Sequence, residues 1–489
     1  MNLKSPFRRL YSYLSLWKRI KRLNAKRLMI ERLRAVPVPL FVPLFAKEEI
    51  VTPTLKRSRP FSRATTAVTR RGRLLPGVCL LVAILISFFS PSTVRAQKAD
   101  LSRVVVVGDS LSAGFQNGSL LDSQQVHGYA NLVAQQAGAN LRLPLIAPPG
   151  IPNVLTLVSP GPPPIIVPAP GTSAGRENPF LQTFDLAVPG ANLHDALFAR
   201  PNFPIDDLTD LILGLPGLLA VPPVSLSQVE WAGALQPTTV VVWMGNNDAL
   251  GAVVNADPSL LTPVAQFQSD YHALMEQLTA AGATVVVANI PDVTVVPFLT
   301  SAQEVAAEVS LPLSVIGPIL GIGPGDFVTP DAFPLIVAIL SNPLLGPLPN
   351  SVVLRAAQIA QIQDAVGAYN AAIAAEASAH GAALVDIHES FSRIQSDGLV
   401  VNGQRLTTGF LGGVFSLDGV HPTNTGYAVV GNEFIKALNR DFAAGVPPVS
   451  VALVAQSDPL VLPGVGHPAS ALGHIDPAMV KSLRQVLGH

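Results

Sequence analysis

A serine follows a short apolar run early in the body of the chain. Residues 104–107 are four valines, and they are continued by Gly108, Asp109 and Ser110. In open α/β folds a buried parallel strand delivers the residues after it to the edge of the sheet where ligands bind. A serine hydroxyl becomes a strong nucleophile only when a neighbouring base removes its proton. The segment therefore predicts a nucleophile at Ser110, provided that the chain supplies a base.

An acid and an imidazole lie three residues apart far along the chain, at Asp418 and His421. Gly419 and Pro422 are unfavourable inside a helix and favour an extended turn. In such a turn a short Asp side chain can reach back to the imidazole, fix its tautomer and stabilise its charged form. We expect Ser110 to act as nucleophile, His421 as general base and then acid, and Asp418 as the group that accepts from His421 Nδ1–H.

Two further apolar runs also end in glycine-containing turns. Residues 184–188 lead into Pro189 and Gly190, and residues 239–244 lead into the sequence Gly-Asn-Asn-Asp at 245–248. A glycine at such a point lets a backbone N–H approach a substrate closely, because no Cβ obstructs it. Preorganised donors of this kind stabilise the oxyanion that develops during acyl transfer.

These four blocks, in this order, resemble those of the GDSL or SGNH hydrolase family, named for its Ser, Gly, Asn and His. The resemblance covers about residues 103–442 and implies a serine ester hydrolase that works through an acyl-enzyme. It also implies an oxyanion hole made by the backbone N–H groups of Ser110 and Gly190 and the amide of Asn247. Asn247 is preferred to Asn246 because the family motif is Gly-x-Asn-Asp. The proline before Gly190 departs from the pattern and leaves the geometry of that block open.

Strand-like and helical segments alternate along the body, which implies a parallel sheet with crossover helices. With the resemblance, this predicts an α/β fold with a three-layer α/β/α, flavodoxin-like core. An ordinary α/β-hydrolase is disfavoured because the block at Ser110 lacks the second glycine of Gly-x-Ser-x-Gly. The expected strands are 103–107, 184–188, 239–244, 284–290 and 383–387; the expected helices are 129–137, 193–198, 263–281, 356–379 and 425–439; a hairpin is expected at 400–405.

Two segments do not fit a minimal sheet. Residues 147–179 are rich in Pro and Gly and predict a long ordered loop near the first block. Residues 301–350 form an apolar insertion broken by Pro and Gly. It could be extra core that covers one side of the domain, or a lid or acyl-binding wall beside the active site.

The neutral total charge hides two different parts. Residues 1–96 carry 20 Lys and Arg against 3 Asp and Glu, which leaves 12 basic and 29 acidic residues and a formal charge of −17 for residues 97–489. This balance argues against nucleic acid as a partner. The single cysteine, Cys79, precedes the body, so disulfide and thiol chemistry are not expected there. No spacing of His, Cys and acids indicates a metal site, and we expect neither metal nor organic cofactor.

The first 96 residues have the pattern of an export signal. An apolar run at 74–89 follows three arginines, and small residues surround Arg95 where a signal peptidase would cut. We expect 74–96 to be the signal-peptide core and cleavage region, and the protein to be secreted or periplasmic. An uncleaved N-terminal membrane anchor is the alternative. The basic extension 1–73 is long for such a signal, and one hypothesis is that translation starts at Val68.

The remaining chain divides into a hydrolase domain at 97–445, containing the insertion, and a C-terminal tail at 446–489. The apolar insertion and scarce basic residues favour a small-molecule or lipid ester of short to medium acyl chain as the substrate. Transient contact of the protein with a membrane or lipid surface is also expected. A carbohydrate O-deacetylase and a catalytically silent surface or lipid-binding protein are the alternatives.

The other polar residues near the blocks have no expected catalytic role. Asp109 and Asp248 are expected to bond local backbone, and the Ser112 hydroxyl to point away from the site. Surface or structural roles are expected for His127, His194, His272, His380 and His388.

Overall fold

A computed structural model describes residues 98–160 and 164–461, together with 484 and 486. The predicted signal peptide, the basic extension and the hypothetical start at Val68 lie outside the described residues. No helix within the described part is long and apolar enough to cross a membrane.

The centre of the described body is a parallel sheet with the strand order β1-β4-β5-β9. Its strands are β1 (Val104–Gly108), β4 (Thr239–Trp243), β5 (Thr284–Ala288) and β9 (Ala383–Val385). All neighbouring pairs are parallel and in register. Both β1 and β4 are buried along their whole length, as expected for valine-rich strands covered on both faces.

The strand predicted at 184–188 is only partly formed. A single parallel bridge joins Asp185 to Val106, although backbone hydrogen bonds continue to Val188, whose N–H donates to Gly108 O at 3.1 Å. The Asp185 carboxylate accepts the N–H of Ala187 within the same segment. The segment nevertheless lies beside β1, so the spatial order is the 2-1-3-4-5 order of flavodoxin-like sheets.

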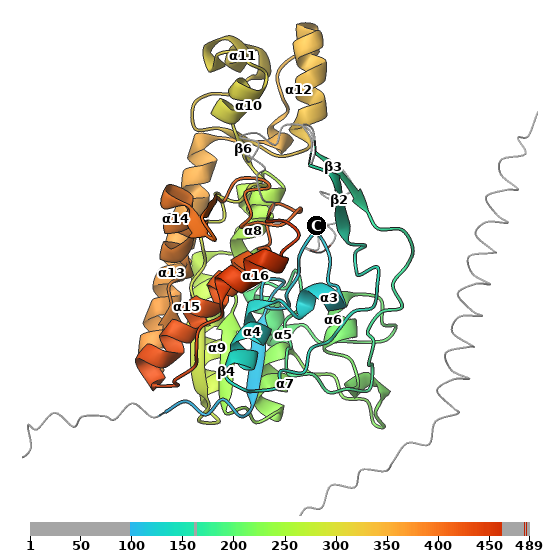
Figure 1. Ribbon diagram of the computed structural model, residues 1–489, viewed down its shortest axis with the longest axis vertical. Helices are drawn as coiled ribbons and strands as arrows, with labels where there is room; N and C mark the ends of the chain where they lie inside the picture. Colours follow the sequence, from blue (N-terminus) through green and yellow to red (C-terminus); the bar gives the residue numbers. More distant parts are fainter. Residues whose placement is uncertain (1–97, 161–163, 462–483, 485, 487–489) are drawn as a thin grey trace, which may run out of the picture. The chain divides into compact units, whose positions relative to one another are not determined.

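Helices cover both faces of this sheet (Figure 1). On one face α15 packs on α4, β5 and β9, and on the other α9 and α13 pack on each other and on β5. The described helices of this body are α3 (Asp122–Gln125), α4 (Tyr129–Gln136), α5 (Leu193–Phe198), α6 (Leu208–Ile212), α7 (Gln228–Ala234), α8 (Asn247–Val254), α9 (Val264–Thr279), α13 (Ala356–Ala379), α14 (Ile387–Asp397), α15 (Asn424–Phe442) and α16 (Val451–Ser457). The three-layer α/β/α prediction is confirmed.

The predicted long loop at 147–179 contains an antiparallel hairpin, which corrects the sequence interpretation. It is formed by β2 (Leu155–Ser159) and β3 (Ile165–Pro168). Prolines around both strands concealed it, since proline is typical of loops and is tolerated only at edges of sheets. The hairpin is joined to the loop after β1 by the N–H of Leu155, which donates to Asn117 O at 2.9 Å.

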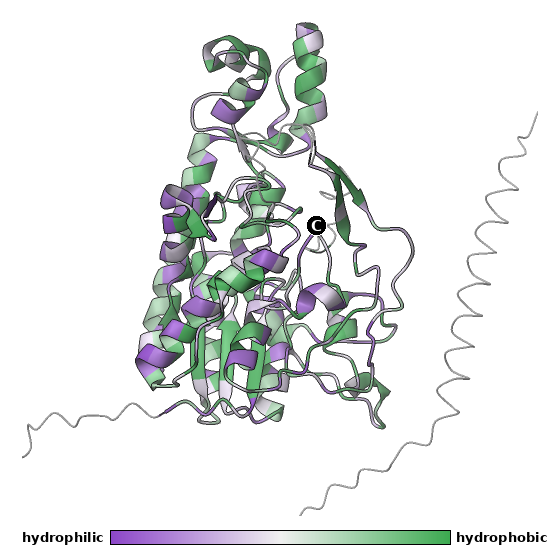
Figure 2. Ribbon diagram, viewed as in Figure 1, coloured by the Kyte–Doolittle hydropathy of each residue, from purple (hydrophilic) through white to green (hydrophobic). Residues whose placement is uncertain are grey.

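The insertion is a small unit with its own core. It contains α10 (Ala302–Glu308), α11 (Leu313–Leu320) and α12 (Ala332–Ser341), together with an antiparallel sheet of β6 (Thr300–Ser301), β7 (Phe327–Val328) and β8 (Val353–Leu354). Its buried apolar side chains form a cluster separate from the main core. Figure 2 shows that α12 is largely hydrophobic, yet Leu335 and Val337 on it are exposed.

The segment after α15 packs onto the main body. Val446, Val449 and Ala455 belong to the main apolar core, and Asp458 accepts hydrogen bonds from the N–H and hydroxyl of Thr425. The hairpin predicted at 400–405 is present as β10 (Leu399–Val401) and β11 (Gln404–Leu406). Its two turn residues both have positive φ, which is the conformation that an Asn-Gly turn provides.

Candidate active site

The three residues of the predicted triad meet at the carboxyl edge of the sheet. Ser110 Oγ lies 2.8 Å from His421 Nε2, and His421 Nδ1 lies 3.1 Å from Asp418 Oδ2. Exposed fractions are 4 % for Ser110, 2 % for His421 and 0 % for Asp418. A hydroxyl, an imidazole and a carboxylate joined in this order are the arrangement that activates serine as a nucleophile.

The Asp418 carboxylate is held in its ionised form by several donors. Burial alone would raise its pKa, but the charge of His421, the hydrogen bond to it and backbone N–H groups outweigh burial and lower the pKa. Oδ1 accepts from the N–H groups of Val420 and His421, and Oδ2 accepts from the N–H of Gly118 at 2.7 Å. A carboxylate fixed on both oxygens can orient the imidazole without rotating.

The turn around Asp418 depends on Gly419. This glycine has φ +69°, and a Cβ there would lie 3.0 Å from the backbone nitrogen of Phe298. The same nitrogen donates to Gly419 O at 2.9 Å, so the chain just before the insertion supports the turn. The extended turn predicted from Gly419 and Pro422 is therefore confirmed.

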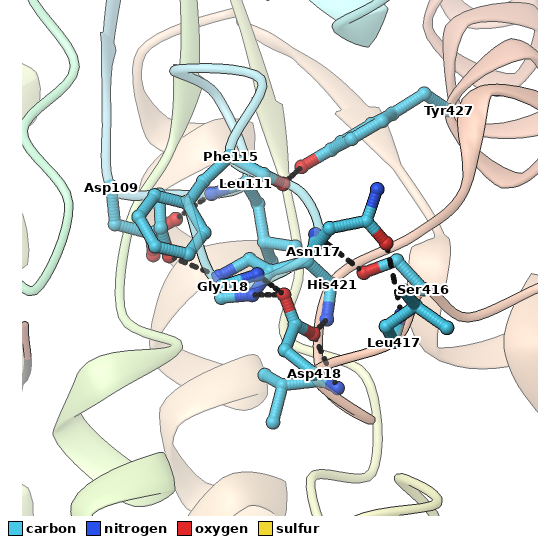
Figure 3. A network of polar contacts seen from close by, with 12 residues as sticks. Asp109, Leu111, Phe115, Asn117, Gly118, Ser416, Leu417, Asp418, His421 and Tyr427 are labelled. Atoms are coloured by element: carbon cyan, nitrogen blue, oxygen red, sulfur yellow. Dashed lines mark hydrogen bonds and ion pairs between the residues drawn. The ribbon is translucent and has the colours of Figure 1, made fainter. Parts of the chain in front are cut away.

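The loop after Ser110 is joined to the loop of His421 by residues that the sequence did not single out. Asn117 N–H donates to Ser416 Oγ, and Asn117 Oδ1 accepts the N–H of Leu417 at 3.1 Å (Figure 3). Tyr427 adds a hydroxyl bond to Phe115 O at 2.6 Å. Asn117 and Gly118 form an Asn-Gly turn signature, which predicts a turn but not a partner about 300 residues away.

Asp109 anchors the turn that carries Ser110. Its Oδ1 accepts the N–H of Leu111 at 2.9 Å, which is the local Asx contact that was predicted. Its Oδ2 accepts from Asn246 Nδ2 at 2.8 Å, so this acid also connects the first block to the third. Burial raises the pKa of Asp109 to about 6, although both hydrogen bonds oppose the shift.

The candidate oxyanion donors lie around the same edge. No acceptor among the described residues takes the backbone N–H of Ser110 or of Gly190. Gly190 has φ +87°, a conformation that favours glycine and supports its place at this turn. Asn247 begins α8, with three residues between it and the end of β4, and its Nδ2 donates one hydrogen bond to Ala191 O at 2.8 Å. A side-chain amide has two N–H groups, so a second donor remains.

A cleft opens beside Ser110. Its volume is about 540 Å³, counting space that is open to solvent. The lining residues combine the polar groups Ser110, Asn246, Asn247, Asp292 and His421 with apolar side chains. The apolar part of the lining includes Leu111, Trp243, Leu250, Val293, Val295, Val296, Phe391, Phe415 and Val420. All lining residues lie outside the insertion, so the alternative of an acyl-binding wall formed by 301–350 finds no support in this conformation.

The remaining polar residues take other partners. Ser112 Oγ bonds to Tyr129 OH at 2.8 Å, so it points away from His421 as predicted. Asp248 was predicted to bond local backbone, and this is wrong: its Oδ2 accepts the N–H of Leu193, which begins α5. The contact is long-range because α5 and α8 both start at the carboxyl edge of the sheet. Burial raises the pKa of Asp248 to about 7.

Solved structures with a similar chain course include three hydrolases. A phospholipase A1 from Streptomyces albidoflavus NA297 is 16 % identical with a TM-score of 0.30, covering 69 % of this chain and 98 % of that one. An extracellular lipase from Streptomyces rimosus is 15 % identical with a TM-score of 0.30, covering 68 % and 98 %. The psychrotrophic esterase EstA from Pseudoalteromonas sp. is 12 % identical with a TM-score of 0.29, covering 69 % and 97 %.

No curated protein matches the chain. The family model for GDSL-like lipases and acylhydrolases matches residues 104–434, which is more than half of the sequence. The match begins at β1 and ends within α15, so it includes all four blocks that the sequence analysis singled out. The chain belongs to the GDSL-like lipase/acylhydrolase family and is a carboxylic ester hydrolase.

Proposed function

We propose that Ser110 is the nucleophile of an acyl-enzyme mechanism in which His421 and Asp418 are the base and its orienting acid. The observation that carries this proposal is the 2.8 Å contact between Ser110 Oγ and His421 Nε2, with Asp418 on the opposite ring nitrogen. His421 takes the hydroxyl proton as Ser110 attacks the ester carbonyl, and returns it to the leaving alcohol. Water then attacks the acyl-enzyme with the same base.

The oxyanion of each tetrahedral intermediate is stabilised by the backbone N–H groups of Ser110 and Gly190 and by Asn247 Nδ2. The absence of other acceptors for the two backbone groups within the described residues supports this role. The bond from Asn247 Nδ2 to Ala191 O supports it as well, because one fixed N–H orients the other. Donors fixed before the reaction stabilise the transition state without reorganising.

The substrate is an ester whose acyl part is apolar and short to medium in length. The predominance of aliphatic and aromatic side chains in the cleft supports this choice over a carbohydrate O-deacetylase, whose sugar would require more polar partners.

The protein is secreted or periplasmic by virtue of a signal peptide at 74–96. Exposed apolar residues on the insertion and on the β2–β3 hairpin support transient contact with a lipid surface, among them Val158, Val337 and Leu344.

The proposal is tested with p-nitrophenyl esters from acetate to palmitate, assayed beside acetylated sugars. We expect the largest kcat/KM for short to medium acyl chains and little release of acetate from sugars. An organophosphonate ester should label Ser110, and peptide mass spectrometry should locate the adduct. Preference for acetylated sugars would favour the deacetylase. No turnover and no label would favour a silent binding protein and would overturn the proposal.

A further inference from the structure

Four acidic and imidazole side chains meet on the seam between α9 and α13. His272 and Glu276 lie one turn apart on α9, and Glu376 and His380 lie one turn apart across the end of α13. Glu376 Oε2 is 3.1 Å from His272 Nδ1 and 3.3 Å from His380 Nε2. Donor atoms of His272, Glu376 and His380 all lie within 4.8 Å of one another.

We propose that His272, Glu376 and His380 bind a divalent transition metal ion, with Zn²⁺ as the best fit. Ligands at about 2.0–2.1 Å from a tetrahedral metal are separated by about 3.3 Å, close to the two distances measured here. Imidazole nitrogen and carboxylate oxygen are both established zinc donors. Water completes the coordination, since the seam is open to solvent: the side chain of His272 is 53 % exposed, that of Glu376 22 % and that of His380 19 %.

The second nitrogen of each imidazole has a partner that can hold its proton once the metal-facing nitrogen binds the ion. Thr279 Oγ1 donates to Met275 O, so its remaining lone pair accepts from His380 Nδ1–H at 3.2 Å. His380 Nε2 then carries the lone pair that faces Glu376. On the other ring His272 Nε2 lies 3.5 Å from Glu276 Oε1, which is placed to accept its proton. Outer carboxylates and carbonyls fix the tautomer of metal-bound histidines in this way.

The charge and the place of the cluster fit a structural cation site. A metal ion displaces the proton that His272 Nδ1 shares with Glu376. With both imidazoles then neutral, the carboxylates of Glu276 and Glu376 carry a charge of −2, which a divalent ion balances, and the body as a whole is acidic. α9 ends just before β5 begins, and α13 ends just before β9 begins. The cluster therefore lies toward the amino ends of the strands, whereas Ser110 follows the carboxyl end of β1. A metal here joins two helices 104 residues apart in sequence without touching the ester site.

The test uses the purified chain without a histidine tag, stripped with a chelator and then titrated with ZnCl2. Calorimetry should show one Zn²⁺ bound per chain, and Tm should rise with Zn²⁺ concentration, since a ligand that binds only the folded state stabilises it. His272→Ala and His380→Ala should each weaken binding by about 100-fold or more and abolish the rise in Tm. Glu276→Gln should weaken it by about 10-fold, as expected for an outer partner.

His194→Ala is the matched control. His194 is also an exposed imidazole beside a carboxylate, with Nδ1 3.1 Å from Asp270 Oδ2, but it lies outside the cluster. This variant should bind Zn²⁺ like the parent. X-ray absorption of the zinc-loaded parent should show two imidazole ligands, which tests the site without any substitution. Binding that requires millimolar Zn²⁺, or that survives His272→Ala unchanged, would overturn the proposal while leaving the proposed ester hydrolysis intact.

Discussion

The two ends of the central sheet carry the same pair of side-chain types in opposite surroundings. Toward the carboxyl end His421 is almost fully buried, with one carboxylate and one hydroxyl as its ring partners. Toward the amino end His272 is half-exposed, with carboxylates near both ring nitrogens. The hydrogen bond to Glu376 raises the pKa of His272, whereas the contacts with His421 help to lower the pKa of Asp418.

A histidine beside a carboxylate does not by itself define a function. A buried ring with one nitrogen fixed by an acid can take the proton of a hydroxyl on its other nitrogen. A ring between two carboxylates in water has no group to activate, and its remaining use is to hold a proton or a cation. The chemistry at each end is decided by the second ring partner, a hydroxyl for His421 and a second carboxylate for His272, and by whether water is excluded.

Removing the Ser110 hydroxyl should have the largest effect on kcat. Ser110→Ala should lower kcat by roughly 10⁴-fold or more, because the residual rate comes only from binding and the oxyanion donors. Tm should change little. The matched control is Ser112→Ala, which removes a hydroxyl two residues away that bonds Tyr129. Turnover of p-nitrophenyl esters measures both, and near-normal activity of Ser110→Ala would remove Ser110 from the mechanism.

Changing the Asp418 carboxylate should have the next largest effect on kcat. Asp418→Asn should lower kcat by about 10⁴-fold, because an amide cannot hold His421 in the required tautomer. Asp270→Asn makes the same change beside the exposed His194 and should leave kcat unaltered. Steady-state kinetics of the two variants compares a pair in which both side chains are buried with a pair whose imidazole is half-exposed. Equal losses of kcat in the two variants would contradict a special role for Asp418.

Two neighbouring asparagines, Asn246 and Asn247, are expected to have different roles, one structural and one in stabilising the oxyanion. Asn247→Ala should lower kcat by roughly 10²–10³-fold with a smaller change in KM, as expected for a donor to the developing oxyanion. Asn246→Ala should affect kcat far less but lower Tm, since the buried Asp109 carboxyl loses a donor. The reverse ranking in kinetics would transfer the oxyanion role to Asn246.

The sequence predicts the four blocks because each is encoded locally. A valine run such as 104–107 predicts a buried strand, and the residue after its end is then placed at the edge. Contacts between distant turns carry no such signal: Asn117 meets Ser416, and Asp248 meets Leu193, only once the sheet has formed. His272 and Glu376 likewise share no spacing in sequence, and only the packing of α9 on α13 brings them together.

Buried acids should make the stability of the body fall as pH rises. Burial raises the pKa of Asp185 to about 7, from 3.8 in an exposed chain. A raised pKa means that the folded state binds the proton more tightly, so this stabilisation is present below about pH 4 and is lost as pH rises through 7. Asp185→Asn keeps the acceptor for Ala187 N–H and should raise Tm by roughly 2 °C or more at pH 8, with less effect at pH 5. An equal change at both pH values would contradict the buried proton.

The smallest effect is expected from the insertion. Its buried residues form a separate core, and the cleft is lined from other parts of the chain. Replacing 302–352 by a short Gly-Ser connection should therefore leave kcat/KM for short and medium esters within about 4-fold, the effect of one buried methylene at ~0.8 kcal/mol. A loss that grows with acyl length would show that the insertion contacts the chain of a bound substrate. A uniform loss with a lower Tm would show instead that it stabilises the domain, in the way that Phe298 supports the turn at Gly419.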